Sequence, residues 1–189
     1  MTDCSCHACA RPNRRAALGG LLGAGLLALS APRALARATL KPARSVDEGF
    51  MRLALAQAAQ GDFPFGAVVE KNGRVLASGR NSGKRLNDPT AHGEMMAIRA
   101  FTAAHPAEEM KGATIYTTGE SCPMCMGAII WCGFSRVVYA ASIEELSKHI
   151  GQIMIDDKTI AAAAPFADVE ITGGVLAKEA LALFSNQPR

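Results

Sequence analysis

The chain has 189 residues, of which 49% are hydrophobic and 5% aromatic, and its formal net charge is +3. This length favours one domain with a buried core, and the composition excludes a disordered chain, a collagen-like repeat and a small disulfide-rich protein. The charge is divided unevenly, because residues 1–38 carry +4 and residues 39–189 carry −1. The larger segment therefore lacks the basic character expected of a nucleic-acid-binding domain.

Residues 1–38 have the pattern of an export signal. A polar stretch ends in Arg14 and Arg15, fifteen weakly apolar residues follow, and small-residue cleavage sites end at Ala36 and Ala38. Because a membrane-spanning helix needs about 20 apolar residues, a stable membrane span is not expected, although an uncleaved anchor is an alternative. The arginine pair resembles a twin-arginine signal and predicts a periplasmic or secreted protein. An ordinary secretory signal, or a misassigned start before a cytoplasmic enzyme, is the alternative.

The six cysteines are divided between the two segments. Three of them (Cys4, Cys6 and Cys9) lie in the export signal, where we do not interpret them as a functional metal site. The other cysteines lie in residues 39–189, which we predict to be the functional domain. Thiols that enter an oxidising compartment unfolded can form disulfides, so a zinc site loaded before export agrees with the twin-arginine route.

The predicted elements of residues 39–189 alternate between helix and strand. Asn72-Gly73 supplies the positive φ angles of a tight hairpin, and Ser142 with Glu145 forms a capping box that begins a helix. Alternation of this kind predicts a three-layer α/β/α fold, with a sheet covered by helices. The predicted helices cover 45–60, 94–104, 123–132 and 175–184, with a further helix beginning at Ser142, and the predicted strands cover 66–70, 74–79, 113–118, 136–140 and 169–172.

Two of these helix starts carry residues that bind metals. His92 lies immediately before one helix, and Cys122 and Cys125 lie at the start of another, three residues apart. One histidine and two cysteines are typical zinc ligands, and three protein ligands leave a fourth position open, as in catalytic sites. The sequence therefore predicts a catalytic Zn²⁺ site. A structural zinc site is the alternative, but Cys132, two helical turns beyond Cys125, is too distant to complete it and is interpreted as a buried thiol.

Glu94 follows His92 by two residues and can move protons without binding the metal. The pattern H-x-E followed by P-C-x-x-C is the signature of zinc nucleobase deaminases. The chain resembles the cytidine-deaminase-like superfamily, in the branch of tRNA adenosine deaminases and guanine deaminases. The resemblance extends over residues 46–139 and is carried by the segments FPFGAVV, DPTAHGEMMAIRA, TGESCPMCMGAIIWCG and RVVYA.

This resemblance implies a five-stranded mixed sheet, usually in a homodimer. It implies that zinc is bound by His92, Cys122 and Cys125, and that Glu94 is the catalytic proton shuttle. The implied substrate contacts are Asn81 as a hydrogen-bonding partner of the base, Phe65, Gly66 and Ala67 as pocket wall, and Trp131 near the pocket. For Trp131 a place in the core or a dimer interface is the alternative, and Asn81 could instead stabilise its own loop.

The sequence departs from the family pattern at two positions, where Ser121 replaces the usual proline and Gly93 the more common alanine. Neither removes a ligand or the acid–base group, so we expect activity to be kept. The near-neutral charge of residues 39–189 and the export signal favour a free nucleobase or nucleoside, with a guanine-like aminopurine as the expected substrate. The alternatives are a tRNA adenosine deaminase with a misassigned start and a catalytically silent zinc-binding interaction module.

Overall fold

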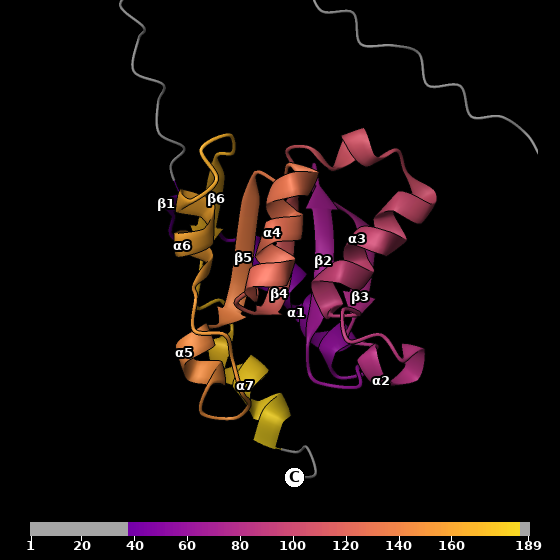
Figure 1. The fold of residues 1–189 in the computed structure, drawn as a ribbon, viewed down its shortest axis with the longest axis vertical. Coiled ribbons are helices and arrows are strands. Elements are labelled where there is room, and N and C mark those ends of the chain that lie inside the picture. Colours follow the sequence, from indigo (N-terminus) through magenta and orange to yellow (C-terminus); the bar gives the residue numbers. More distant parts are fainter. Residues whose placement is uncertain (1–37, 186–189) are drawn as a thin grey trace, which may run out of the picture. The chain divides into compact units, whose positions relative to one another are not determined.

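The computed structural model describes residues 38–185 (Figure 1). The predicted export signal, including Arg14, Arg15 and its three cysteines, lies outside the described residues apart from Ala38. The middle layer of the described part is a six-stranded mixed sheet in the order β1-β6-β5-β4-β2-β3. The strands are β1 (Ala38–Leu40), β2 (Gly66–Lys71), β3 (Arg74–Arg80), β4 (Thr114–Gly119), β5 (Arg136–Ala141) and β6 (Val169–Thr172).

Helices cover both faces of this sheet, as Figure 1 shows. Helices α3, α4 and α6 pack on one face, around a core that includes Phe101 and Met126. Helices α1 and α7 pack on the other face, around a core that includes Met51 and Tyr116. The helices are α1 (Asp47–Ala58), α2 (Gly83–Leu86), α3 (Gly93–Ala104), α4 (Pro123–Cys132), α5 (Ile143–Leu146), α6 (Asp157–Ala162) and α7 (Ala177–Ser185), with a 3₁₀ turn η1 (Ala107–Met110).

The three-layer prediction is confirmed, with one correction to the strand count. The sheet has six strands because Ala38–Leu40 pairs in parallel with β6 at its edge. Three residues carry too little pattern to be recognised as a strand, and their partner lies far along the chain. The hairpin prediction is confirmed, since Asn72 and Gly73 have φ angles of 55° and 77° between antiparallel β2 and β3.

The capping box at Ser142 and Glu145 is also present, but the helix that it begins ends at Leu146. The Ser147 hydroxyl donates to the Glu144 carbonyl at 2.8 Å, and such local bonds compete with helix propagation. Within residues 38–185, no helix combines the length and the apolar character that crossing a membrane requires.

The topology gathers several chain segments at one edge of the sheet. Strands β4, β5 and β6 run parallel and end there, and β2, which is antiparallel to β4, begins there. Helices α3 and α4 both begin at the same edge, because each follows a strand that ends at it. In sheets of this kind, ligands bind beyond the carboxyl ends of the parallel strands, so this edge is the expected position of a functional site.

Candidate metal centre and active site

The three predicted zinc ligands meet where α3 and α4 begin. His92 is the N-cap residue of α3 and Cys122 that of α4, both with extended backbone angles, and Cys125 lies in the first turn of α4. Pro123 occupies the first helical position, where its missing N–H costs no hydrogen bond. The imidazole and the two thiols therefore project from adjacent helix starts toward one point, and their ligand atoms all lie within 4.8 Å of one another.

The dimensions of this triad fit a zinc ion. The Nδ1 atom of His92 lies 3.6 Å from Sγ of Cys122 and 3.6 Å from Sγ of Cys125. Zinc bound at about 2.05 Å from nitrogen and about 2.3 Å from sulfur, at tetrahedral angles, separates those two atoms by about 3.6 Å. In the part of the chain that the structure describes, no fourth histidine, cysteine or carboxylate joins the group. Three ligands and an open fourth position are typical of catalytic zinc.

The pKa values of the three side chains also favour metal binding. Hydrogen bonds from Cys125 and His92 lower the pKa of Cys122 to about 4, against the opposing effect of burial. The hydrogen bond with Cys122 in turn raises the pKa of His92 and that of Cys125. One sulfur is thus anionic at a helix N-terminus, where the helix dipole favours negative charge. A divalent cation would displace the remaining protons and bind all three atoms.

Glu94 lies in the first turn of α3, beside the triad but outside it. Its side chain is only 7% exposed, and burial raises the pKa of its carboxyl group. A buried carboxyl group with a raised pKa holds its proton more readily than a free one, which suits a group that passes a proton to a ligand. Because Glu94 lines the same cavity as His92 and Cys122, it can exchange protons with a ligand bound there.

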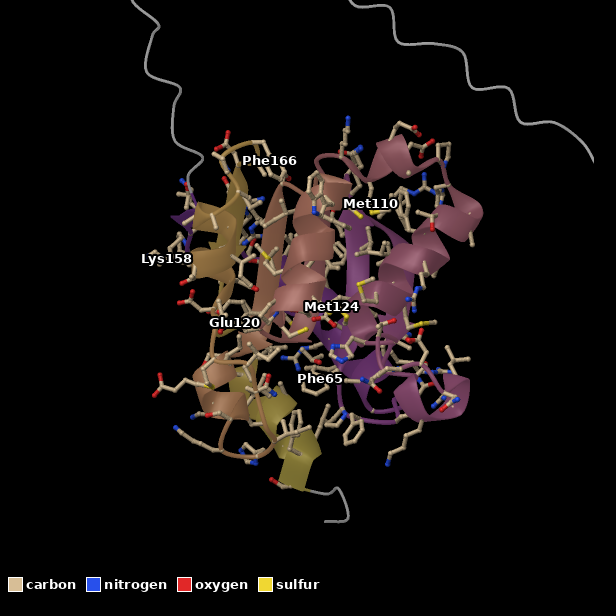
Figure 2. All side chains as sticks on the ribbon, in the orientation of Figure 1. Phe65, Met110, Glu120, Met124, Lys158 and Phe166 are labelled. Carbon is tan, nitrogen blue, oxygen red and sulfur yellow. The ribbon has the colours of Figure 1, made fainter. Side chains whose placement is uncertain are left out.

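The cavity in front of these residues has a volume of about 380 Å³, within the range of small-molecule sites. Among the predicted site residues, Phe65 and Asn81 line it together with His92, Glu94 and Cys122. The Phe65 ring is held from behind by an edge-to-face contact with Phe184 of α7, with ring centroids 5.3 Å apart. In Figure 2, Phe65, Met124 and Glu120 are labelled around the start of α4, and all three line the cavity.

Asn81 stabilises its own loop and also lines the cavity, while its hydrogen bond to the base stays a prediction. It lines the cavity, and its Oδ1 atom accepts a hydrogen bond from the Gly83 backbone at 3.3 Å. The side chain is 6% exposed, so the loop bond fixes the orientation of the amide against the cavity.

Three predicted substrate contacts do not line this cavity. Gly66 faces α1, since a Cβ atom there would meet the Ala54 carbonyl oxygen, and Ala67 is buried in the core between the sheet and α3. Trp131 is 80% exposed and stacks on Phe166 with ring centroids 5.0 Å apart. It lies six residues beyond Cys125, which is about 9 Å further along the helix. The expectation that Trp131 lies near the pocket is therefore corrected for this chain.

Several cavity residues were missed by the sequence analysis. Met124 lies between the two cysteines, Pro89 precedes the His92 motif, and Ile150–Ile153 forms a further wall. The segment at 150–153 has neither helical nor strand periodicity, so nothing in its pattern indicated a pocket. The segment leads into the apolar run Ile153-Met154-Ile155, but a short apolar run is as consistent with a buried strand as with a pocket wall.

Comparison with known proteins agrees with this geometry. A model of the cytidine and deoxycytidylate deaminase zinc-binding region matches residues 44–141, about half of the chain. The matched range contains the His–Cys–Cys triad and Glu94.

The most similar proteins include two kinds of deaminase. Guanine deaminase of Bacillus subtilis strain 168 is 41% identical over 99 residues, which cover 50% of this chain and 64% of that protein. The tRNA-specific adenosine deaminase of Aquifex aeolicus strain VF5 is 34% identical over 112 residues, 57% of this chain and 72% of that protein. A solved structure in complex with 2,6-diaminopurine superposes with a TM-score of 0.64 at 25% identity, over 74% of this chain and 79% of that chain. The chain thus spans less than two thirds of the length of the guanine deaminase.

Proposed function

We propose that this chain, which belongs to the cytidine and deoxycytidylate deaminase zinc-binding family, is a hydrolytic deaminase of a free nucleobase or nucleoside. The proposed reaction replaces the amino group on a ring carbon by the oxygen of water and releases ammonia. The observation that carries the proposal is the buried Glu94 carboxyl beside the His92–Cys122–Cys125 triad, because Glu94 lines one cavity together with His92 and Cys122.

The chain's own residues account for the proton transfers of this reaction. Zinc held by His92, Cys122 and Cys125 would supply Lewis acidity that lowers the pKa of water. Glu94 accepts a proton from the attacking water and donates it to the ring nitrogen beside the reacting carbon. It then takes the remaining hydroxyl proton and donates it to the amino group, which leaves as ammonia while the carbon–oxygen double bond forms. Glu94 ends in its starting state, so two transfers through one carboxylate balance the reaction.

The remaining cavity residues orient the ring. Asn81 presents a side-chain amide to the cavity, and an amide can pair with the donor and acceptor atoms on a base edge. The Phe65 ring, fixed by Phe184, supplies a flat apolar surface beside the base. Together these contacts hold the ring while Glu94 moves protons.

A guanine-like aminopurine is the substrate class that we propose. Similarity to a guanine deaminase and to a structure in complex with 2,6-diaminopurine supports a purine base. The charge of −1 over residues 39–189 argues against tRNA, since phosphate binding depends on cationic side chains. The relationship to a tRNA-specific adenosine deaminase keeps tRNA as the second candidate.

Release of ammonia from a panel of substrates tests the proposal. Guanine, 2,6-diaminopurine, adenine and cytosine, their nucleosides and tRNA should be compared with zinc-loaded protein, and free purines should react fastest. Glu94→Gln should keep zinc and lose turnover by at least about 100-fold. Exposed Glu108→Gln is the matched control and should keep full activity. Turnover confined to tRNA would overturn the substrate class, and an active Glu94→Gln variant would overturn the mechanism.

We also propose that the protein is exported. The arginine pair supports export, and the position of β1 bears on the cleavage site. Because β1 begins at Ala38, cleavage after Ala38 would remove one of its three residues, whereas cleavage after Ala36 leaves the strand intact. We therefore propose a periplasmic or secreted protein whose mature N-terminus is Arg37. N-terminal sequencing of the exported protein tests the cleavage site, and replacement of Arg14 and Arg15 by lysine should block export by the twin-arginine route.

A homodimer is proposed from the composition of α4. This helix has no charged or amide side chain, and a helix that is apolar all round is usually buried. Trp131 and Phe166 are nevertheless 80% and 62% exposed, so a second copy of the chain would cover them. Trp131→Glu should convert a dimer to a monomer in sedimentation measurements, and a wild-type monomer would contradict the proposal.

A further inference from the structure

One wall of the cavity is formed by a segment without regular structure. Residues Ile150–Ile153 line the cavity, but within the described residues 151–156 belong to no helix or strand. Ile153, Met154 and Ile155 are 59%, 61% and 42% exposed, so burial contributes little to fixing their positions. The shape of this wall therefore depends on how its two ends are held, at α5 on one side and α6 on the other.

Both ends are held by one side chain, Glu120. Its Oε2 atom accepts a hydrogen bond from the Ile143 backbone at 2.8 Å, and its Oε1 atom accepts one from the Asp157 backbone at 3.1 Å. Ile143 and Asp157 are the first residues of α5 and α6. Amides at these positions have no partner within their own helix, so the carboxylate satisfies two buried donors that no carbonyl of the same helices can reach.

Glu120 is itself fixed to the turn that carries the zinc ligands. It lies two residues before Cys122, its own backbone donates to the Ala141 carbonyl at 2.8 Å, and its side chain is only 8% exposed. It also lines the cavity. One buried carboxylate therefore connects the two ends of the wall at 150–153 to the turn that carries Cys122.

We propose that Glu120 is a positioning residue that sets the affinity for the base by fixing the wall at 150–153. Each of its two oxygens already accepts a backbone hydrogen bond, so it is not placed as a further proton carrier. Losing one bond should loosen the wall and weaken substrate binding, while Glu94 and the triad keep their geometry. This inference rests on the proposed deaminase function where it is tested by KM and kcat. The test by hydrogen exchange does not depend on that function.

The first test is Glu120→Gln in zinc-loaded protein. Glutamine has one acceptor oxygen and an NH₂ group, so it can satisfy only one of the two backbone amides. KM for the base should rise about tenfold, as expected for the loss of one charge-assisted hydrogen bond, while kcat stays within about threefold and zinc content is unchanged. Glu145→Gln is the matched control, because Glu145 caps α5 through Ser142 without lining the cavity, and KM should not change.

A second variant removes a donor instead of the acceptor and leaves the zinc turn untouched. In Ile143→Pro the ring occupies the first helical position, which proline tolerates, and the preceding Ser142 already has extended angles, with φ −72° and ψ 160°. The same rise in KM is expected. Ile143 is itself only 3% exposed, so Ile143→Ala, which shortens the same side chain and keeps the backbone N–H, is the packing control and should leave KM unchanged. If Glu120→Gln does not fold, the comparison of the two Ile143 variants decides the question.

Hydrogen exchange gives a readout that needs no turnover. Amides of residues 147–156 should exchange at least about tenfold faster in Glu120→Gln and Ile143→Pro than in wild type or Glu145→Gln. Unchanged exchange and unchanged KM in a folded variant would overturn the inference, as would a fall in kcat with KM unchanged. If wild type deaminates no base, the proposed function fails, and the exchange result still decides whether Glu120 holds the wall.

Discussion

Arg136 donates hydrogen bonds of 2.7 Å from both terminal nitrogens to the two carboxylate oxygens of Asp47, which is 89 residues away in sequence. The two side chains are 3% and 0% exposed, and the Tyr116 hydroxyl donates to the same carboxylate at 3.0 Å. This buried ion pair joins the first residue of α1 to the first residue of β5. It lies at the edge of the sheet opposite the metal centre, so it bears on stability without contacting the site.

Arg136→Met should destabilise the fold strongly, because it leaves the Asp47 carboxylate buried without its partner. Breaking one side of a buried pair costs about 3–5 kcal/mol, measured as the free energy of unfolding in urea at pH 7. Arg44→Met is the control, since Arg44 pairs with Glu170 at 2.6 Å but both side chains are more than one third exposed. That pair should contribute at most about 1 kcal/mol. Equal losses in the two variants would contradict the assignment.

The same pair predicts how stability depends on pH. Burial alone would raise the pKa of Asp47, but hydrogen bonds from Arg136 and from the Arg44 backbone hold it below the usual 3.8. The stabilisation is therefore fully present above the unfolded pKa and is lost as pH falls through the lower folded pKa. Wild type should lose stability below about pH 4.

In Arg136→Met the contribution of Asp47 to the pH dependence of stability should have the opposite sign. Without the guanidinium, burial raises the pKa of Asp47, so this variant should gain stability as pH falls from 7 toward 4. Urea unfolding at three pH values would show the difference between the two proteins narrowing on acidification. Parallel curves would show that Asp47 does not titrate as described.

The parts of the site that could be predicted from sequence are those that local geometry determines. His92 and Cys122 could be placed because a helix start fixes where the neighbouring side chains point, and Cys125 follows one turn later. Glu94 was assigned through the H-x-E signature that the chain shares with zinc nucleobase deaminases, and its position in the first turn of α3 agrees with that assignment. The spacing between the His92 motif and the Cys122–Cys125 motif, by contrast, could be explained only from the fold, in which β4 brings the two helix starts to one edge of the sheet.

What could not be predicted depends on contacts between distant segments. Strand β1 exists because its partner β6 presents a free edge, and nothing in three residues specifies that pairing. The exposure of Trp131 follows from the direction of the outer face of α4, which an apolar helix without polar residues does not reveal. The role of Glu120 could not be predicted, because both its bonding partners are backbone amides, which leave no trace in side-chain patterns.

Gly79 controls how closely α3, and with it Glu94, approaches the sheet. A Cβ atom there would lie within 3.0 Å of the Gly93 carbonyl oxygen and of the Ala97 nitrogen, both backbone atoms of α3. Gly79→Ala should therefore push the helix outward, lowering stability by about 1–3 kcal/mol and weakening zinc binding.

Gly49→Ala is the matched control for that substitution. Gly49 lies within α1, and a Cβ atom there meets nothing within 4 Å. The change should stabilise the protein by about 0.5–1 kcal/mol through helix propensity and leave zinc binding alone. Urea unfolding together with zinc titration distinguishes the two effects, and full zinc affinity in Gly79→Ala would show that α3 can move without disturbing His92.

The cysteines of α4 allow the metal assignment to be tested within one helix. Cys125→Ser replaces a thiolate ligand, 3.6 Å from His92 Nδ1, by a hydroxyl that zinc binds poorly, whereas Cys132→Ser changes a half-buried thiol that packs against the core. Purified Cys132→Ser should carry one zinc per chain, and Cys125→Ser should carry almost none and unfold at lower temperature. Removal of zinc from wild type by a chelator should produce the same loss of thermal stability, because an ion that binds only the folded state stabilises it. Zinc loss in both variants, or in neither, would show that the His92–Cys122–Cys125 triad is not what holds the metal.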